Sequence, residues 1–295
     1  MRVFDAHCDT ISEMYEKKQD FAKNSLHIDF ERMKKYEAYT QVFAVFTDPE
    51  KRAKAKEYEN TLIDLFYDEM QKNGVCICKN YEDYENAKTP YRAFLSIEGA
   101  EGITEEADLL RLKQRGVFMI APVWNFKNKI ACGVMEDEDT GLSELGKRII
   151  AKMDKLGIIL DVSHMSPKSF YDSAKIFKKP ICASHSNLKA VTNHPRNLTD
   201  EQFLIIKNSG GVAGINIYPP FLGESVKAHI DRFLALGGED NIGLGCDFDG
   251  VDALPDGING IEDIEKLIKN LPYSTKIREK LAEKNFLRVI KAYNC

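Results

Sequence analysis

The sequence predicts one (β/α)8 barrel that spans residues 1–295, and three observations favour this fold class. The chain has 295 residues with 43% hydrophobic content, enough to bury one large core and a common length for such barrels. Eight short apolar runs are typical of strands, and amphipathic patterns between them indicate helices. The ends of the first and last runs, Asp9 and Asp247, lie 238 residues apart, so each of the seven intervals averages about 34 residues, close to the length of one βα unit.

The strands are predicted from these apolar runs. They cover residues 3–9, 39–46, 91–98, 117–124, 158–164, 181–185, 212–218 and 242–247. Most runs are continuously apolar rather than alternating, which is typical of parallel strands covered on both faces. A closed barrel and a doubly wound open sheet share this local pattern, so both architectures stay open, and the count of eight favours the barrel.

Start and stop signals define the helices between the strands. Ser143 precedes an amphipathic pattern that ends at Gly157, because glycine is suited to the backbone conformation that follows a helix. Ser166 and Pro167 open a second helix that runs toward residues 176–177. The last stretch, residues 261–293, is predicted to form two amphipathic helices that pack on the barrel.

Composition and charge argue against several functional classes. The net charge is -5 and Lys and Arg form no cluster with aromatic residues, so we expect no nucleic acid partner. The chain starts without a basic and apolar leader, and no apolar run approaches the roughly 20 residues that span a bilayer, so we expect a cytoplasmic protein without a membrane partner. The seven cysteines lack C-x-x-C spacing, and we expect them to be reduced thiols.

Metal-capable side chains lie at the carboxyl ends of the predicted strands, where barrel enzymes build their sites. The first strand ends in His7-Cys8-Asp9, and residues two apart on a strand point to the same side, so the imidazole and the carboxylate converge. Such a pair is weak evidence alone, because it also occurs as an ordinary hydrogen-bonded pair. Glu98 ends the third strand, and a carboxylate that caps a helix N-terminus is its alternative role.

Two further histidines strengthen the metal hypothesis. His164 and His185 end the fifth and sixth strands, so that with His7 three of the six histidines lie on one rim. Neutral imidazoles and carboxylates are ligands that suit zinc. Five such ligands exceed the needs of one catalytic ion, whereas two ions that share a carboxylate use them all, so we expect two metal ions. The other histidines are expected at the surface or behind the site: His27, His194 and His229.

The eighth strand ends in Asp247, and its glycines leave room for a substrate above it. An acid at this position can also serve as a turn residue, but Asp249-Gly250 is the better candidate for that turn.

Several motifs resemble those of the membrane (renal) dipeptidase family, zinc peptidases with an amidohydrolase-type barrel. The resemblance runs nearly from end to end of the chain, and its motifs are together highly specific. They are Asp5-Ala6-His7-Cys8-Asp9, Ser96-Ile97-Glu98-Gly99, the long block from Gly141-Leu142-Ser143-Glu144-Leu145-Gly146 through Asp161-Val162-Ser163-His164, Ser184-His185-Ser186, Pro195-Arg196-Asn197, Asn216-Ile217-Tyr218, Gly245-Cys246-Asp247-Phe248-Asp249-Gly250 and Asn285-Phe286-Leu287-Arg288-Val289.

The resemblance implies a role for each site residue. It implies hydrolysis of dipeptides, with L,D-dipeptides among the candidates, by a hydroxide that bridges two Zn²⁺ ions. His7 and Asp9 would bind one ion, His164 and His185 the other, and Glu98 would bridge them. Asp247 would carry the proton, and Arg196 would grip the free carboxylate of the dipeptide with its planar guanidinium. A surface salt bridge is the alternative role of Arg196. Two aromatic residues would complete the substrate site: Trp124 and Tyr218.

One position departs from the family pattern. Animal members carry a histidine after the fourth strand that touches the reacting carbonyl, whereas this chain has Trp124, whose indole donates one hydrogen bond but carries no proton. The departure leaves the substrate range and the source of oxyanion stabilisation open. Two other functions also stay open: a different two-metal amidohydrolase, such as an N-acyl-amino-acid deacylase, and a catalytically silent metal-binding barrel. A dipeptide is the expected small-molecule partner, and a homodimer stays open as well.

Overall fold

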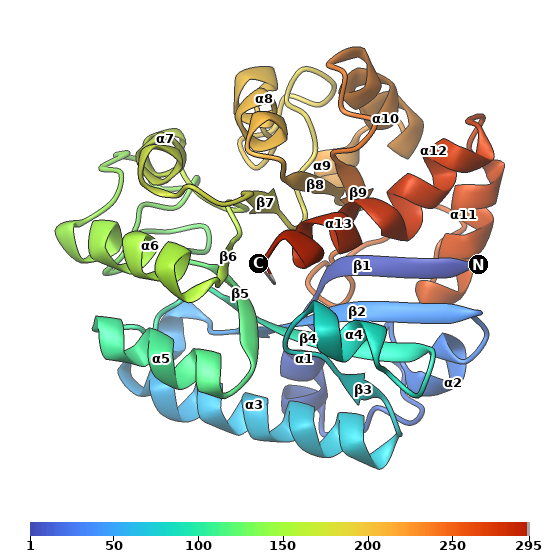
Figure 1. Cartoon of the computed structure of the whole chain (residues 1–295), viewed down its shortest axis with the longest axis horizontal. Helices are drawn as coiled ribbons and strands as arrows, with labels where there is room; N and C mark the ends of the chain where they lie inside the picture. Colours follow the sequence, from blue (N-terminus) through green and yellow to red (C-terminus); the bar gives the residue numbers. More distant parts are fainter. Residues whose placement is uncertain (294–295) are drawn as a thin grey trace.

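The computed structural model describes residues 1–293. Eight parallel strands form its centre, and helices surround them (Figure 1). The strands are β1 (Arg2–Cys8), β2 (Ala38–Phe46), β4 (Tyr91–Glu98), β5 (Val117–Ala121), β6 (Ile159–Leu160), β7 (Cys182–Ala183), β8 (Val212–Ile215) and β9 (Ile242–Leu244). A short additional strand, β3 (Cys76–Ile77), pairs with β4 and was not predicted.

The strand order decides between the two architectures that the sequence leaves open. The order is β6-β5-β4-β2-β1-β9-β8-β7, and β1 pairs with both β2 and β9. The first and last strands of the chain are therefore neighbours, as a closed barrel requires. The remaining seam, between β6 and β7, is crossed by a bridge between Asp161 and Cys182 and by a hydrogen bond of 2.8 Å from Val162 N to Cys182 O. The barrel prediction is confirmed.

The helices connect successive strands and cover the outside of the barrel (Figure 1). They are α1 (Thr10–Lys17), α2 (Phe30–Met33), α3 (Ala55–Lys72), α4 (Tyr81–Glu85), α5 (Glu106–Gln114), α6 (Glu144–Leu156), α7 (Pro167–Ile176), α8 (Asp200–Asn208), α9 (Pro219–Leu222), α10 (Val226–Ala235), α11 (Ile264–Asn270), α12 (Thr275–Glu279) and α13 (Asn285–Ala292). Shorter helical turns cover Pro49–Lys54 and Ile261–Asp263, and a π-helical turn, Lys280–Lys284, joins α12 to α13.

The predicted helix boundaries are confirmed. Ser143 caps α6 by accepting a hydrogen bond from the backbone of Gly146, and Gly157 ends the helix with a φ of 64°. Ser166 caps α7 in the same way, with Pro167 as its first residue. The segment from residue 261 onward forms two helical stretches, as predicted, which are separated after Asn270.

Five predicted strands were too long by two or more residues at their carboxyl ends, because the site residues leave the sheet there. Pro122, which has no backbone N–H, follows β5. After β6, Asp161 Oδ1 accepts a hydrogen bond from Ser163 N, and after β8, Asn216 Oδ1 accepts one from Tyr218 N. In the last residues of these predicted strands, backbone N–H groups thus donate to side chains instead of to a neighbouring strand. β7 and β9 also end before their predicted bounds.

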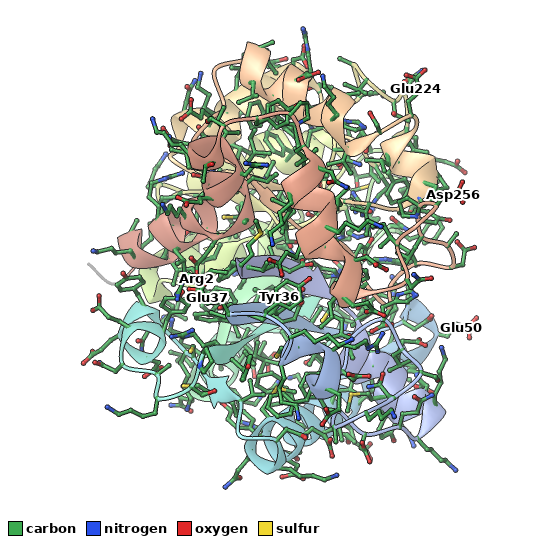
Figure 2. All side chains as sticks on the ribbon, turned by 90° about the vertical axis from the view of Figure 1, so that its right-hand side faces the viewer. Arg2, Tyr36, Glu37, Glu50, Glu224 and Asp256 are labelled. Atoms are coloured by element: carbon green, nitrogen blue, oxygen red, sulfur yellow. The ribbon has the colours of Figure 1, made fainter. Side chains whose placement is uncertain are left out.

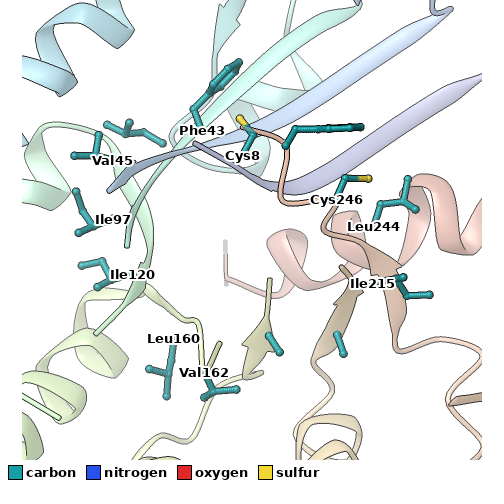
Figure 3. Close-up of a cluster of buried hydrophobic side chains, with 14 of the residues drawn as sticks. Cys8, Phe43, Val45, Ile97, Ile120, Leu160, Val162, Ile215, Leu244 and Cys246 are labelled. Atoms are coloured by element: carbon teal, nitrogen blue, oxygen red, sulfur yellow. The ribbon is translucent and has the colours of Figure 1, made fainter. Parts of the chain in front are cut away.

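Apolar side chains from successive strands form the core outside the barrel wall (Figure 3). Cys8 lies between His7 and Asp9, and Ile97 precedes Glu98, so the alternation of a strand sends the apolar residue outward and the polar residues inward. Cys8 and Cys246 are fully buried, and the six cysteines of residues 1–293 are free thiols, as expected. Cys295 lies outside the described residues.

The two ends of the barrel carry different parts of the chain, as Figure 2 shows. Arg2 and Glu37 mark the starts of β1 and β2 and lie on one side of that view. Glu50, Glu224 and Asp256 belong to connections that follow β2, β8 and β9, and they lie on the other side. The carboxyl ends of the strands therefore share one face of the molecule, and the polar residues predicted there are brought together.

Candidate metal centre

Six predicted residues converge at the carboxyl end of the barrel. Their ligand atoms form three groups in which all atoms lie within 4.8 Å of one another. The groups are His7, Asp9 and Glu98; Glu98, His164 and His185; and His7, His185 and Asp247. All six side chains are buried. Each comes from the end of a different strand except His7 and Asp9, which share β1 and the residue after it.

The backbone is strained at this cluster. Among the described residues, four that are not glycine have a positive φ, and three of them lie here: His164 at 69°, Asp247 at 63° and Asp249 at 65°. A left-handed conformation is costly for such residues and persists where the surrounding structure enforces it, often at functional sites. The strain aims the His164 and Asp247 side chains into the barrel mouth.

Glu98 occupies the centre of the cluster, with an imidazole on each side. Its Oε1 lies 2.8 Å from His164 Nε2 and 3.4 Å from His185 Nε2, and its Oε2 lies 3.4 Å from His7 Nε2. Burial opposes ionisation of Glu98, but the charge of His7, the largest influence in its favour, helps to hold the pKa of Glu98 well below its usual range. Glu98 thus belongs to two of the three groups of ligand atoms.

Hydrogen bonds fix the tautomers of two of these histidines. His164 Nδ1 lies 2.8 Å from Asn125 Oδ1, an oxygen that can only accept, so Nδ1 carries the proton. Ser184 Oγ donates to Asp161 Oδ2 and therefore accepts from His185 Nδ1, at 2.6 Å. In both rings Nε2 is left with a free lone pair.

Those lone pairs provide a test of whether the site suits a metal ion. His164 Nε2 and His185 Nε2 lie only 2.9 Å apart, and burial lowers the pKa of both rings, which favours their neutral forms. Two lone pairs and Glu98 Oε1 thus face one another without a proton between them, which is unfavourable unless a cation lies among them. The donor set of imidazole and carboxylate fits zinc or a similar ion.

Asp9 and Asp247 flank the other side of the cluster. Asp9 Oδ2 lies 3.3 Å from His7 Nε2, while the buried Asp9 Oδ1 has no hydrogen-bond partner among the described residues. Burial and the nearby Glu98 raise the pKa of Asp9 to about 7. Asp247 Oδ1 lies 3.7 Å from His7 Nε2, and its Oδ2 accepts a hydrogen bond of 2.8 Å from Asn216 Nδ2.

Gly250 is required beside these carboxylates. A Cβ atom at this position would lie 2.2 Å from Asp9 Oδ2 and 2.6 Å from Asp247 Oδ1. Glycine therefore keeps the space around the two carboxylates free. The turn predicted at Asp249-Gly250 is present, but Asp249 has a larger role, because its buried carboxylate accepts hydrogen bonds from Thr10 Oγ1 at 2.6 Å and His27 N at 2.7 Å.

Arg196 lies beside the cluster and is buried, with 5% of its surface exposed. Its Nε and Nη2 have no hydrogen-bond partner in the described part of the chain, and the guanidinium lies 5.4 Å from the centre of the Phe221 ring. Burial lowers the pKa of Arg196. A buried cation with two unused donors is a site prepared for an anion. Arg196 therefore does not form the surface salt bridge that was its alternative role.

An open cavity of about 360 Å³ lies above the cluster. Its lining includes the predicted substrate residues Trp124, Arg196 and Tyr218, with Asp9, Glu98, His164 and Asp247 at its floor. Phe46 and Phe221 line it as well. The Tyr218 hydroxyl hydrogen-bonds Asp252 at the rim, and this bond raises the pKa of Tyr218.

Sequence reasoning missed the residues that hold the ligands. Asn125, Ser184 and Asp161 orient two histidines, and Asn216 orients Asp247. Each lies within or beside a recognised motif, but the residue type alone does not distinguish this role from a turn or a cap. Of the two places expected for His229, the surface is excluded, because His229 is fully buried and accepts a hydrogen bond from Leu188 N.

Comparison with known proteins decides the family. A family model described as "Membrane dipeptidase (Peptidase family M19)" matches residues 1–294. The chain belongs to the membrane dipeptidase family. The resemblance predicted from the motifs is thus confirmed, and so is the prediction of a metal-dependent dipeptidase.

Solved structures and curated relatives agree with the family. The crystal structure of dipeptidase AC, a metallopeptidase of family M19, superposes with a TM-score of 0.91 at 26% identity over 100% of this chain and 99% of that one. A metallopeptidase from Rhodobacter sphaeroides, liganded with a phosphinate mimic of the dipeptide L-Ala-D-Ala, gives 0.89 at 25% identity over 99% of both chains. An uncharacterised dipeptidase of Schizosaccharomyces pombe is 32% identical over 68% of this chain and 52% of its own length.

A further relative, an uncharacterised protein encoded in the pqqA 5' region of Klebsiella pneumoniae, is 37% identical over 66% of this chain and 79% of its own length. None of the helices within residues 1–293 combines the length and the apolar character needed to cross a membrane.

Proposed function

We propose that this membrane dipeptidase family member is a two-zinc enzyme in which Glu98 would be a ligand of both ions. His7 and Asp9 would hold one ion, and His164 and His185 the other. The observation that carries the proposal is the position of Glu98, whose two oxygens lie within 3.4 Å of three imidazole nitrogens from three different strands. Asp247 Oδ1 lies close enough to His7 Nε2 to reach the first ion as well.

Zinc suits this donor set because it accepts both imidazole nitrogen and carboxylate oxygen. The bound ions would supply Lewis acidity toward the peptide carbonyl and lower the pKa of the attacking water. Two divalent ions would also neutralise the acidic floor of the cavity, where Asp9, Glu98 and Asp247 are buried together.

Arg196 would bind the carboxylate of the dipeptide. Its free donors lie in the wall of the cavity, and a guanidinium can hold a carboxylate with two parallel hydrogen bonds. The carboxylate would then fix the distance between the chain end and the scissile bond, which favours dipeptides over longer peptides. Tyr218 and Trp124 line the same cavity.

The cavity rim favours a substrate with a free amine. Glu13 and Asp252 lie at the rim, and within residues 1–293 Arg196 is the only arginine or lysine that lines the cavity. An ammonium group would therefore find acidic partners at the end of the substrate opposite its carboxylate. An acylated amine would lose this interaction, so the rim favours a dipeptidase over an N-acyl-amino-acid deacylase.

Asp247 would move the proton. Its carboxylate is buried at the cavity floor, and burial together with Glu98 raises its pKa. Asn216 Nδ2 holds Oδ2, which leaves Oδ1 directed toward the cluster. Asp247 could accept the proton of the attacking water and return it to the leaving amine.

The test is hydrolysis of a dipeptide panel by metal-free and zinc-loaded protein. The panel would contain L,L and L,D pairs, each with its N-acetylated counterpart. We expect hydrolysis of free dipeptides that requires zinc, and at least about tenfold weaker hydrolysis of the acetylated forms. Preferential hydrolysis of acetylated substrates would support a deacylase, and no hydrolysis of any substrate by zinc-loaded protein would support a silent barrel.

A further inference from the structure

Two aromatic residues, Phe46 and Trp124, form a wall of the cavity, and Phe46 lies on the side that faces Arg196. Phe46 is the last residue of β2, and Arg196 lies in the connection after β7. In the strand order β6-β5-β4-β2-β1-β9-β8-β7, strands β2 and β7 lie on opposite sides of the barrel. Both residues line the same cavity, with the metal ligands between them.

The wall is directly above the ligands. Phe46 pairs in register with Glu98, and its ring centre lies 5.2 Å from that of Trp124, at an interplanar angle of 58°. The Trp124 ring centre lies 6.1 Å from that of His164. Both aromatic side chains are half-buried and present apolar surface to the cavity. The two rings therefore lie against the position at which the peptide bond would be cleaved.

The position of the wall determines what it would contact. With the substrate carboxylate on Arg196 and the scissile carbonyl at the metal ligands, the carboxyl-terminal residue lies between these two points. The amino-terminal residue then extends past the ligands, toward β2 and β5. Its amine would face the acidic rim and its side chain would face Phe46 and Trp124.

We propose that Phe46 and Trp124 select dipeptides whose first residue has a large apolar side chain, such as leucine or phenylalanine. This inference rests on the proposed function. Burial of an aliphatic or aromatic side chain against two rings removes apolar surface from water, and each added methylene that is buried in this way raises kcat/KM. A glycine or alanine at the same position would leave the wall exposed.

Phe126 offers a matched control. Its ring centre also lies near that of Trp124, at 6.1 Å, but its side chain is 48% exposed and does not line the cavity. Removal of Phe126 thus takes away an aromatic neighbour of Trp124 without changing the surface that a substrate would contact.

The experiment compares kcat/KM for Leu-Ala, Phe-Ala and Gly-Ala, which share their second residue. For zinc-loaded wild-type protein we expect Leu-Ala and Phe-Ala to exceed Gly-Ala by at least about tenfold. Phe46→Ala and Trp124→Leu should each reduce this ratio at least fivefold, as estimated from the loss of one of two contact surfaces. Phe126→Ala should leave the ratio unchanged. Zinc content and circular dichroism of each variant establish that it is folded, and two independent wall variants ensure that one misfolded protein does not decide the outcome.

The outcomes separate the inference from the function on which it rests. Equal hydrolysis of all three dipeptides by wild-type protein, or a ratio that neither wall variant alters, would overturn the selectivity and leave the dipeptidase intact. A reduction by Phe126→Ala as large as that by Phe46→Ala would also overturn it, because a general disturbance of the loop would then explain both. Failure to hydrolyse any dipeptide would overturn both the function and the inference.

Discussion

His164 and His185 face each other through their Nε2 atoms, which lie 2.9 Å apart, and each ring is held from behind by a bond at Nδ1. The two rings come from the ends of different strands, β6 and β7, which are joined by an isolated bridge between Asp161 and Cys182 and by the hydrogen bond from Val162 N to Cys182 O. The chain thus keeps two buried lone pairs in contact at the seam of its barrel. A cation bound between the two rings and the adjacent Glu98 would remove the repulsion between these lone pairs.

The first prediction is that the protein carries about two zinc equivalents and is stabilised by them. A metal that binds only the native state raises the free energy of unfolding with the logarithm of the metal concentration. Chelation should therefore lower the unfolding temperature as well as abolish activity. Elemental analysis and thermal unfolding check both. Full activity with one equivalent would contradict the two-metal assignment.

A second prediction concerns Asn125, which holds the tautomer of His164. Asn125→Ala leaves His164 Nδ1 without its acceptor, so the ring can rotate or change tautomer, and zinc affinity should fall about 10 to 100-fold. The measurement is competition for zinc against a chromophoric chelator, which does not depend on catalysis. Asn125→Asp keeps an acceptor oxygen at the same place and should retain most of the affinity. If both variants bind zinc like the wild type, Asn125 does not orient the ligand.

A third prediction concerns Arg196. Arg196→Lys replaces a planar guanidinium, which can donate two parallel hydrogen bonds, with a single ammonium group. KM for dipeptides should therefore rise by at least about tenfold while zinc content stays the same. Steady-state kinetics with elemental analysis checks this. Unchanged kinetics would show that the unused donors of Arg196 do not meet the substrate.

The sequence was sufficient to predict the barrel and the residues that meet at its mouth. Strand ends such as Glu98 and His164 are marked by a change from apolar to metal-capable residues, and a closed parallel barrel brings all such ends to one face. The strained φ of His164 and Asp247 could not be predicted, because neither residue type nor spacing signals a left-handed conformation. The supporting side chains were missed because their roles depend on long-range contacts, as between Asn216 and Asp247.

A fourth prediction concerns stability and the loop that follows Glu98. Glu59, on α3, is fully buried and accepts a hydrogen bond of 2.8 Å from Gly102 N. Burial raises its pKa from 4.5 to about 7, against the opposing effects of Gly102 and Arg111. Because the folded pKa is the higher one, the unfolded chain loses its proton first as pH rises. Glu59 therefore costs stability progressively between about pH 4.5 and 7, and the full cost is present above pH 7.

Glu59→Gln should remove this cost, since the amide oxygen can still accept the bond from Gly102 and carries no charge to bury. Compared with wild type, the variant should gain about 1 to 3 kcal/mol of unfolding free energy at pH 8 and almost nothing at pH 4. Urea unfolding at the two pH values measures the difference. A gain of equal size at both would mean that ionisation of Glu59 is not its source, and a loss at pH 8 would mean that the charge pair with Arg111 outweighs burial.

The last prediction concerns Asp247, the residue that separates an enzyme from a metal-binding barrel. Asp247→Asn replaces a carboxylate with an amide of nearly the same size. The bond from Asn216 to Oδ2 can be replaced by one to the amide oxygen, so the fold should persist. A positioned proton carrier contributes roughly 10² to 10⁴ in rate, so kcat should fall at least about a hundredfold, whereas KM should change less because Arg196 still holds the substrate.

Kinetics must be accompanied by zinc analysis, because Asp247 Oδ1 lies only 3.7 Å from His7 Nε2. Retained zinc with lost turnover supports the proton carrier. Loss of zinc together with turnover would make Asp247 a ligand first, and near-normal turnover would assign the proton to another group.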